Sequence, residues 1–289
     1  MFRLLVLAAL FFVLSCTSST PEMKKDVGIS VQLWSVRDAC KKDFEGTLKE
    51  LSDMGMEGVE FAGYYHFSKN PEGLKEVLNK LNLKPAATHI KTNDLLPENI
   101  EKTIAFHKVL GCKYLIVSYD KKVFTTLESN AEVAKVFTEA NKTLMKHGMR
   151  AGYHNHTDDM KPCGPCGDKT WWEVLATNTD QDFILQQDVG WTWNAGQDPV
   201  KMVKKHPQRT ITTHFRPHIP KSMEGKGYKP FIGENGQDWE ALIDACLIQG
   251  GTEWFSIEQT YYPDGMTSMK AVEKSFNNLI GILKKMGIR

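Results

Sequence analysis

The feature that most constrains the fold is a recurring unit in which a helical pattern ends in glycine and a β-rich run follows at once. Leu48–Gly55 precedes the run 58–61, and Leu144–Gly148 precedes the run 149–154. Glycine is the usual residue just past a helix, because it adopts a left-handed conformation without a Cβ penalty. The connections are therefore short, as is typical of α/β proteins.

Eight such units are predicted along the chain. The candidate strands span 29–34, 57–62, 84–89, 113–119, 149–155, 182–188, 210–215 and 253–258, and helical patterns follow near 44–54, 72–82, 98–110, 131–147, 169–177, 199–205, 238–249 and 267–286. Apolar strands that alternate with helices indicate a parallel sheet. Eight units favour a (β/α)8 TIM barrel, a single α/β domain over 28–289. An open doubly wound sheet is the alternative, but no glycine-rich phosphate loop follows the first strand.

The charge balance excludes some partners. Among 289 residues, 36 basic and 35 acidic side chains leave a net charge of +1. We therefore expect no nucleic-acid footprint and no broad anionic-membrane surface. A homo-oligomer is compatible with the sequence, which leaves the oligomeric state open.

The first residues resemble an export signal. Arg3 precedes the apolar run 4–14, which is too short to cross a bilayer core of roughly 30 Å. Ser15 and Cys16 follow, and the segment resembles a bacterial lipobox with Cys16 as the lipidated residue. We expect a lipoprotein signal peptide over 1–16 and a tether over 17–27. The chain would then be a periplasmic or cell-envelope lipoprotein that meets the membrane only through this anchor. Ordinary cleavage that leaves Cys16 free is the alternative.

Polar and aromatic residues stand where the predicted strands end. The active site of a (β/α)8 barrel lies at those ends. We take seven of these residues as candidates to bind substrate: Trp34, Arg37, His89, Tyr119, His156, Trp191 and Arg216. Taken alone, His89 or Tyr119 is equally well explained as a hydrogen-bonded core group.

Four consecutive strands end in His, Asp, His and Glu. In a closed barrel these strands are neighbours, so their ends can face one point near the axis. Imidazole together with carboxylate suits a divalent transition metal, and magnesium less well. Asp188, His214 and Glu258 are therefore predicted to hold one divalent ion, namely Mn, Zn, Co, Ni or Mg.

Over about residues 28–288 the chain resembles the xylose isomerase-like superfamily of sugar phosphate isomerases and epimerases. The resemblance rests on the order and spacing of six short motifs, which lie at 58–61, 153–156, 188–191, 213–216, 232–239 and 257–259. It implies one divalent metal held by residues that end strands 5 to 8. By position these are His154, Asp188, His214 and Glu258.

The chain departs from the family pattern in two places. Epimerases of this superfamily usually carry Glu on strand 5, and two Glu residues exchange the substrate proton. Here His154 stands in that place, and His156 shares its face because strand side chains alternate. Either histidine is open as the fourth ligand, with His154 also open as a base. After the strand 7 histidine, Arg216-Pro217 replaces the common Lys-Asp.

These residues suggest an enzyme that acts on a small carbohydrate with a carbonyl beside a hydroxyl. The metal would bind both oxygens and stabilise an enediolate. Glu258 would move the proton, with His154, His156 or Glu60 on the opposite face. Isomerisation or epimerisation is the first prediction, and β-elimination by a lyase or hydratase, for example on a 3-keto-glycoside, is the second. A non-catalytic sugar-binding envelope lipoprotein is the alternative from another class.

Cys163 and Cys166 copy the spacing of a redox motif. They lie in the loop after strand 5 rather than at the start of a helix in a thioredoxin-like unit. We therefore expect a local disulfide, consistent with an oxidising compartment.

Overall fold

A computed structural model describes residues 27–234 and 236–289 and shows eight parallel strands closed into a barrel. Each strand pairs with the next along the chain, and β8 pairs with β1. The strands are β1 Gly28–Gln32, β2 Gly58–Phe61, β3 Lys84–Ile90, β4 Tyr114–Val117, β5 Arg150–His154, β6 Ile184–Asp188, β7 Thr212–Phe215 and β8 Trp254–Ile257. The closure confirms the predicted (β/α)8 fold and excludes the open sheet.

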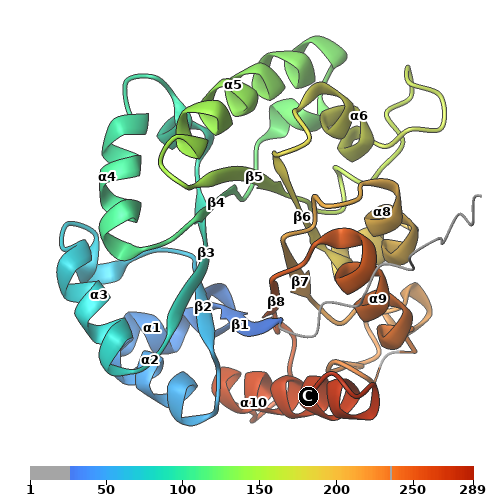
Figure 1. The fold of residues 1–289 in the computed structure, drawn as a ribbon. Coiled ribbons are helices and arrows are strands. Elements are labelled where there is room, and N and C mark those ends of the chain that lie inside the picture. The colour runs from blue at the N-terminus through green and yellow to red at the C-terminus, as the bar shows by residue number, and fades with distance from the viewer. Residues whose placement is uncertain (1–26, 235) are drawn as a thin grey trace, which may run out of the picture.

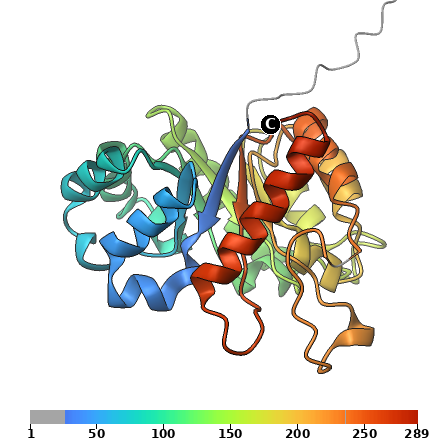
Figure 2. The ribbon, with the colours of Figure 1, turned by 90° about the horizontal axis from the view of Figure 1, so that it is seen from below.

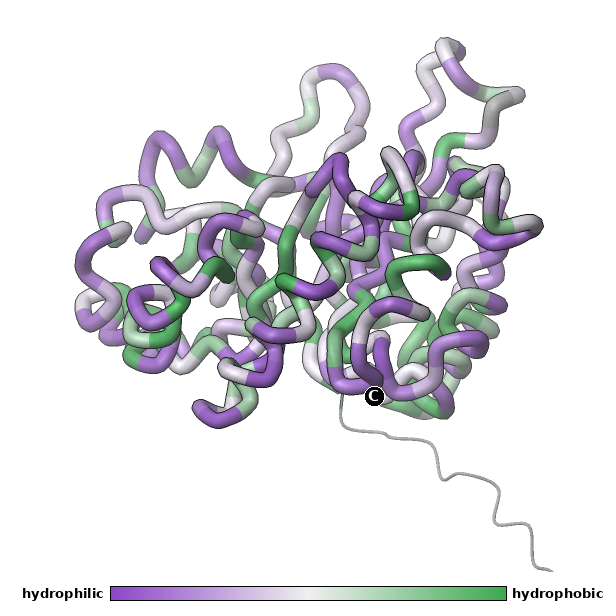
Figure 3. The backbone as a smooth tube through the Cα atoms, turned by 90° about the horizontal axis from the view of Figure 1, so that it is seen from above, coloured by the Kyte–Doolittle hydropathy of each residue, from purple (hydrophilic) through white to green (hydrophobic). Residues whose placement is uncertain are grey.

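The helices surround the strands as an outer layer (Figure 1). They are α1 Arg37–Lys42, α2 Phe44–Asp53, α3 Pro71–Lys80, α4 Ile100–Leu110, α5 Leu127–Met145, α6 Trp171–Asn178, α7 Val189–Asn194, α8 Pro199–Lys205, α9 Trp239–Ala245 and α10 Ser268–Lys285. Hydrophilic and hydrophobic residues alternate along these helices (Figure 3). This is the pattern of helices that bury one face against a sheet.

Local signals set many helix ends. The side chain of Asn70 accepts a hydrogen bond from the Gly73 N–H and caps α3, which has proline in its first turn. Gly111 has a φ of +82° just past α4 and lets the chain turn directly into β4. These short turns bring each strand back into the barrel in register.

The helices differ from the sequence prediction in several places: α5 begins four residues earlier than predicted, and the short helix α1 was not predicted. The predicted helix 238–249 is shorter as an α-helix, because α9 passes into a π-helical turn over Cys246–Gly250. A separate short helix, α7, starts directly after β6 and was not predicted, because Asp188 ends the strand and also caps the helix. The strand bounds themselves agree with the prediction to within two residues at every end.

The predicted signal peptide 1–16, its lipidation site Cys16 and residues 17–26 of the tether lie outside the described residues. Val27, the last tether residue, is buried in the main hydrophobic cluster, so contacts with the barrel begin there. Across 27–234 and 236–289, no helix combines the length and apolarity needed to span a bilayer.

Candidate metal centre

Four side chains from neighbouring strands meet at the carboxyl end of the barrel. His154 ends β5, Asp188 ends β6, His214 lies on β7, and Glu258 follows β8. One potential ligand atom from each lies within 4.8 Å of the others, and all four residues are buried. The arrangement is a compact set of two imidazoles and two carboxylates.

His214 is held between two carboxylates. Its Nδ1 lies 2.7 Å from Glu258 Oε2, and its Nε2 lies 2.8 Å from Glu60 Oε1. Burial alone would lower the pKa of His214, but the negative charge and hydrogen bonds of Glu60 and Glu258 outweigh it and raise the pKa to about 10. The ring is therefore oriented with Nδ1 toward the cluster and Nε2 toward the barrel interior.

Glu60 lies below this ring in a polar layer of the barrel. Its carboxylate accepts hydrogen bonds from Gln32, Gln186 and Ser256 as well as from His214. Burial would raise the pKa of Glu60, but the charge and hydrogen bonds of His214 and His89 hold it below its usual range. Every oxygen of this carboxylate is occupied by a donor.

This layer contains residues that the sequence analysis missed, above all Gln186. Its amide nitrogen donates to Glu60 and to Thr212 Oγ1, so its oxygen accepts from His154 Nδ1 at 3.1 Å. Burial and the neighbouring His214 charge hold the pKa of His154 well below its usual range, so the ring is neutral. With Nδ1 engaged, Nε2 is the nitrogen left to coordinate an ion.

The cluster fits a divalent metal. A neutral imidazole, an oriented second imidazole and two buried carboxylates are the donor types that manganese, zinc, cobalt and nickel accept in proteins. Glu60 behind His214 and Gln186 behind His154 supply the outer hydrogen bonds that orient metal-bound histidines. The structure places His154 rather than His156 in this set.

Arg216 borders the cluster and contacts both carboxylates. Its Nε lies 2.7 Å from Asp188 Oδ2, its Nη2 pairs with Glu258, and its Nη1 donates to Thr260 Oγ1 at 2.5 Å. A Cβ at Gly190 would lie 2.7 Å from the Arg216 side chain, so only glycine leaves room for it. The guanidinium also lies 4.7 Å from the centre of the Trp191 ring.

A cavity of about 530 Å³ opens above the cluster. All seven residues proposed from sequence to bind substrate contribute to its wall, together with His154 and Glu258. Trp34 and Tyr119 are 51% and 53% exposed at its rim, which leaves their rings available to a ligand. Glu60 is absent from this lining, because it lies one layer deeper.

Two buried nitrogens at the cavity have no hydrogen-bond partner among the described residues. They are His156 Nδ1 and Trp191 Nε1. A buried polar atom without a partner costs about 1–3 kcal/mol, so such atoms are expected to meet a ligand or water. Their position marks the wall between β5 and β6 as a polar contact surface.

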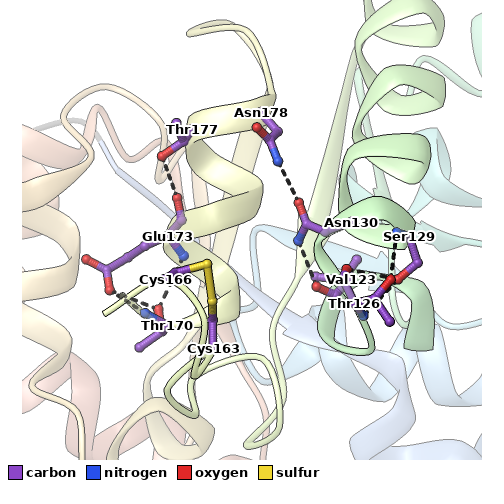
Figure 4. The surroundings of a disulfide bond; sticks show 10 residues. All are labelled: Val123, Thr126, Ser129, Asn130, Cys163, Cys166, Thr170, Glu173, Thr177 and Asn178. Carbon is purple, nitrogen blue, oxygen red and sulfur yellow. Dashed lines mark hydrogen bonds between the residues drawn. A yellow bond between two sulfur atoms is a disulfide. The ribbon is translucent and has the colours of Figure 1, made fainter. Parts of the chain in front are cut away.

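The predicted local disulfide is present in the loop after β5. Cys163 and Cys166 have Cα atoms 5.6 Å apart and lie beside the start of α6, where Thr170 and Glu173 form a capping box (Figure 4). The same loop is tied to the site by Asp159, whose carboxylate accepts from Tyr153 Oη and from the His156 N–H. The disulfide therefore stabilises a loop next to the cavity.

Known proteins share this fold and much of its length. No family model matches the chain. It is 24% identical over 280 residues to an inosose dehydratase of Clostridium botulinum, covering 83% of the chain and 91% of that relative. A solved sugar phosphate isomerase/epimerase from Parabacteroides distasonis superposes with a TM-score of 0.73 at 23% identity, covering 87% of this chain and 97% of that one.

A second solved structure, an IOLI protein with a binding zinc atom, superposes with a TM-score of 0.67 at 14% identity, covering 90% of this chain and 99% of that one. Two further structural neighbours are named a xylose isomerase-like TIM barrel fusion protein and a xylose isomerase domain protein. The chain is therefore a (β/α)8 barrel whose fold is similar to that of these proteins, and the resemblance predicted from its motifs is confirmed. At sequence identities of 14–24%, the similarity to these proteins establishes the fold of the chain alone.

Proposed function

We propose that the protein is a metal-dependent enzyme that removes a proton from the carbon beside the carbonyl of a small carbohydrate. The observation that carries the proposal is the four-residue donor cluster at the floor of a polar cavity. A bound divalent ion would act there as a Lewis acid that polarises the carbonyl and stabilises the negative charge left by deprotonation. One structural neighbour is named with a binding zinc atom, which supports a metal in this protein.

Glu258 is the residue placed to move the proton. It is the only carboxylate among the described residues that line the cavity. Arg216 and His214 contact its two oxygens and hold its pKa at about 2 against the opposing effect of burial, so it is ionised. A carboxylate with this orientation can accept a proton from carbon and return it.

Glu60 acts through His214. Its oxygens are all engaged and it does not reach the cavity, so we assign it a positioning role rather than the contact with substrate considered from sequence. It accepts the His214 Nε2–H hydrogen bond and thereby directs Nδ1 toward the metal position. His154 is engaged as a metal ligand, so His156, which also lines the cavity, is the histidine that we assign to the opposite face of the substrate.

Two outcomes are chemically open once the proton has left. Return of the proton to the neighbouring carbon or to the other face gives an isomerase or epimerase, which remains the first proposal. Expulsion of a β-substituent gives a lyase or dehydratase. The absence of a second carboxylate in the described cavity wall favours this alternative, and so does the dehydratase name of the curated relative.

The test measures metal content and proton exchange. Purified protein is analysed for bound metal, beside Asp188→Ala with His214→Ala and the control Asp53→Ala, whose side chain is 63% exposed and distant from the site. About one ion per chain in wild type and control, and none in the double variant, is expected. Incubation in D2O with ketohexoses and 3-keto-glucosides should then incorporate deuterium beside the carbonyl.

The same experiment separates the alternatives. Deuterated isomers indicate isomerisation or epimerisation, and an unsaturated product with a released group indicates elimination. Tight sugar binding by metal-free protein without any exchange would instead support the non-catalytic binding protein. No metal in wild type after incubation with manganese, zinc, cobalt and nickel would contradict the metal-dependent mechanism.

We also propose that the protein is exported and anchored through Cys16, on the strength of the sequence signal alone. Mass spectrometry of the protein from membranes should show a chain that begins at a lipid-modified Cys16. An unmodified chain that begins elsewhere would contradict the anchor.

A further inference from the structure

A second cavity of about 520 Å³ lies beside the first. The two share Trp191 and Arg216 in their walls, so a single stacked pair separates them. The other walls of the second cavity come from α7, the loop after β7 and the loop after β8. Figure 2 shows the loop after β7 in orange and the loop before α10 extending beyond the same end of the barrel.

The second cavity has the surfaces that bind a ring with hydroxyl groups. Tyr228 and Tyr261 present aromatic rings, and Asn194, His218 and Lys229 supply polar groups. Aromatic faces pack against the apolar face of a ring, and polar groups at the edges receive its hydroxyls. The proposed proton transfer uses none of these five residues.

The loop that forms this cavity is held in place by its own contacts. Tyr228 Oη donates to the Glu234 carbonyl at 2.8 Å, and Lys229 Nζ pairs with Asp264 Oδ1 at 3.1 Å. Gln259 Nε2 donates to the Pro230 carbonyl at 3.1 Å and joins this loop to the one after β8. The cavity is therefore formed before a ligand arrives.

The dividing wall carries a further sign of a ligand. Trp191 lies in both linings, and its Nε1 is buried without a partner among the described residues. Arg216 on the same wall contacts Asp188 and Glu258, so the second cavity begins one side chain away from the metal cluster. A ligand that spans the wall would have one end at the cluster and a second ring beyond Trp191.

We propose that the second cavity is a subsite for the second ring of the substrate, so that the enzyme acts on a glycoside or another two-ring carbohydrate rather than on a free monosaccharide. This proposal rests on the proposed function, because it assumes that the first ring reacts at the cluster. The second ring occupies the space bounded by Tyr228, Tyr261 and Trp191. The two cavities together accept a substrate of about disaccharide size.

The test compares two probes that share their first ring. These are the 3-keto derivatives of methyl and phenyl β-glucoside, and calorimetry measures their affinities for the metal-loaded protein. Wild type should bind the phenyl probe about tenfold more tightly, as expected for one added ring contact. In Tyr228→Ala the ratio of the two affinities should fall to about 1, whereas the control Tyr262→Ala, outside the second cavity, should keep it.

Tyr228→Ala could lose the phenyl preference because its loop becomes disordered, so a second variant tests the same subsite without removing Tyr228. Ile219→Trp adds bulk to the cavity wall without removing a side-chain hydrogen bond, and it should also abolish the preference. Equal affinities in wild type, or no measurable binding of the phenyl probe, would overturn the subsite. Metal content and deuterium exchange with the methyl probe report separately on the proposed function, so either proposal can fail while the other stands.

Discussion

The two ends of the barrel both hold charged groups, but they arrange them for opposite purposes. At the amino end, Arg289 pairs with Glu57 and donates to the Val27 carbonyl at 2.5 Å, and Glu57 also accepts from the Ile29 N–H. At the carboxyl end, charged side chains surround a cavity, and two buried nitrogens there have no hydrogen-bond partner within 27–234 and 236–289. The charged groups at the amino end hold the chain terminus against the barrel, whereas those at the carboxyl end can bind a metal or a substrate.

Close packing marks the amino end as well. A Cβ at Gly28 would lie 2.4 Å from the Trp254 ring, and one at Gly58 would lie 2.7 Å from the Lys84 carbonyl. At the carboxyl end, Gly190 makes room for Arg216 beside the cluster. The contrast predicts that substitutions at the carboxyl end change activity and that substitutions at the amino end change stability.

The largest effect is expected for Glu258→Gln. The amide keeps the size of the side chain but cannot accept the substrate proton, so kcat should fall by about 10²–10⁴-fold. Steady-state kinetics on the substrate found by deuterium exchange measures this, with the midpoint of thermal unfolding as the control for folding. Full activity of the variant would refute the proton-transfer role.

Glu60→Gln should come next and act without touching substrate. Loss of the charge behind His214 weakens the orientation of its ring, and metal affinity should fall by about 10–100-fold. Competition with a chelator measures the affinity, and excess metal should restore much of the activity. A loss of activity that excess metal leaves unchanged would instead indicate direct contact with substrate.

Gly58→Ala tests the amino end. The added methyl meets the Lys84 carbonyl and the Trp254 ring, so the free energy of unfolding should drop by about 1–3 kcal/mol. Denaturant titration gives this value, and kinetics on the folded variant should match wild type. A changed KM with unchanged stability would break the division between the two ends.

The smallest effect is expected for Glu57→Gln. The pair with Arg289 is partly exposed and should contribute about 0.2–1 kcal/mol. Burial would raise the pKa of Glu57, but Arg289 lowers it below 4.5, so the stabilisation is present above pH 4.5 and is lost as pH falls through the lowered folded-state value. Unfolding titrations at pH 7 and pH 3 should show a larger difference from wild type at the higher pH.

Periodicity was enough to predict the fold, because each helix–glycine–strand unit is a local pattern. The same logic brought His154, Asp188, His214 and Glu258 together, since neighbouring strands of a closed barrel end side by side. Alternation along β6 would also have found Gln186, which stands two residues before Asp188 and faces the same way.

The depth of Glu60 could not be predicted in this way. Whether a residue on β2 reaches the cavity depends on the stagger of all eight strands, and the register between β2 and β3 shifts between Val59 and Glu60. The contacts of Arg216, which follows β7, likewise depend on the space that Gly190 of α7 leaves beside it. These are properties of packing between distant segments, which local sequence patterns do not contain.

The position of Val27 has a consequence for orientation. It enters the barrel beside Arg289 at the amino end, whereas the loops around the cavities extend from the opposite end (Figure 2). An anchor on the segment that precedes Val27 would therefore join the domain at the pole farthest from the pocket entrance. A protein held in this way on a surface would turn its entrance outward, toward molecules that arrive from solution.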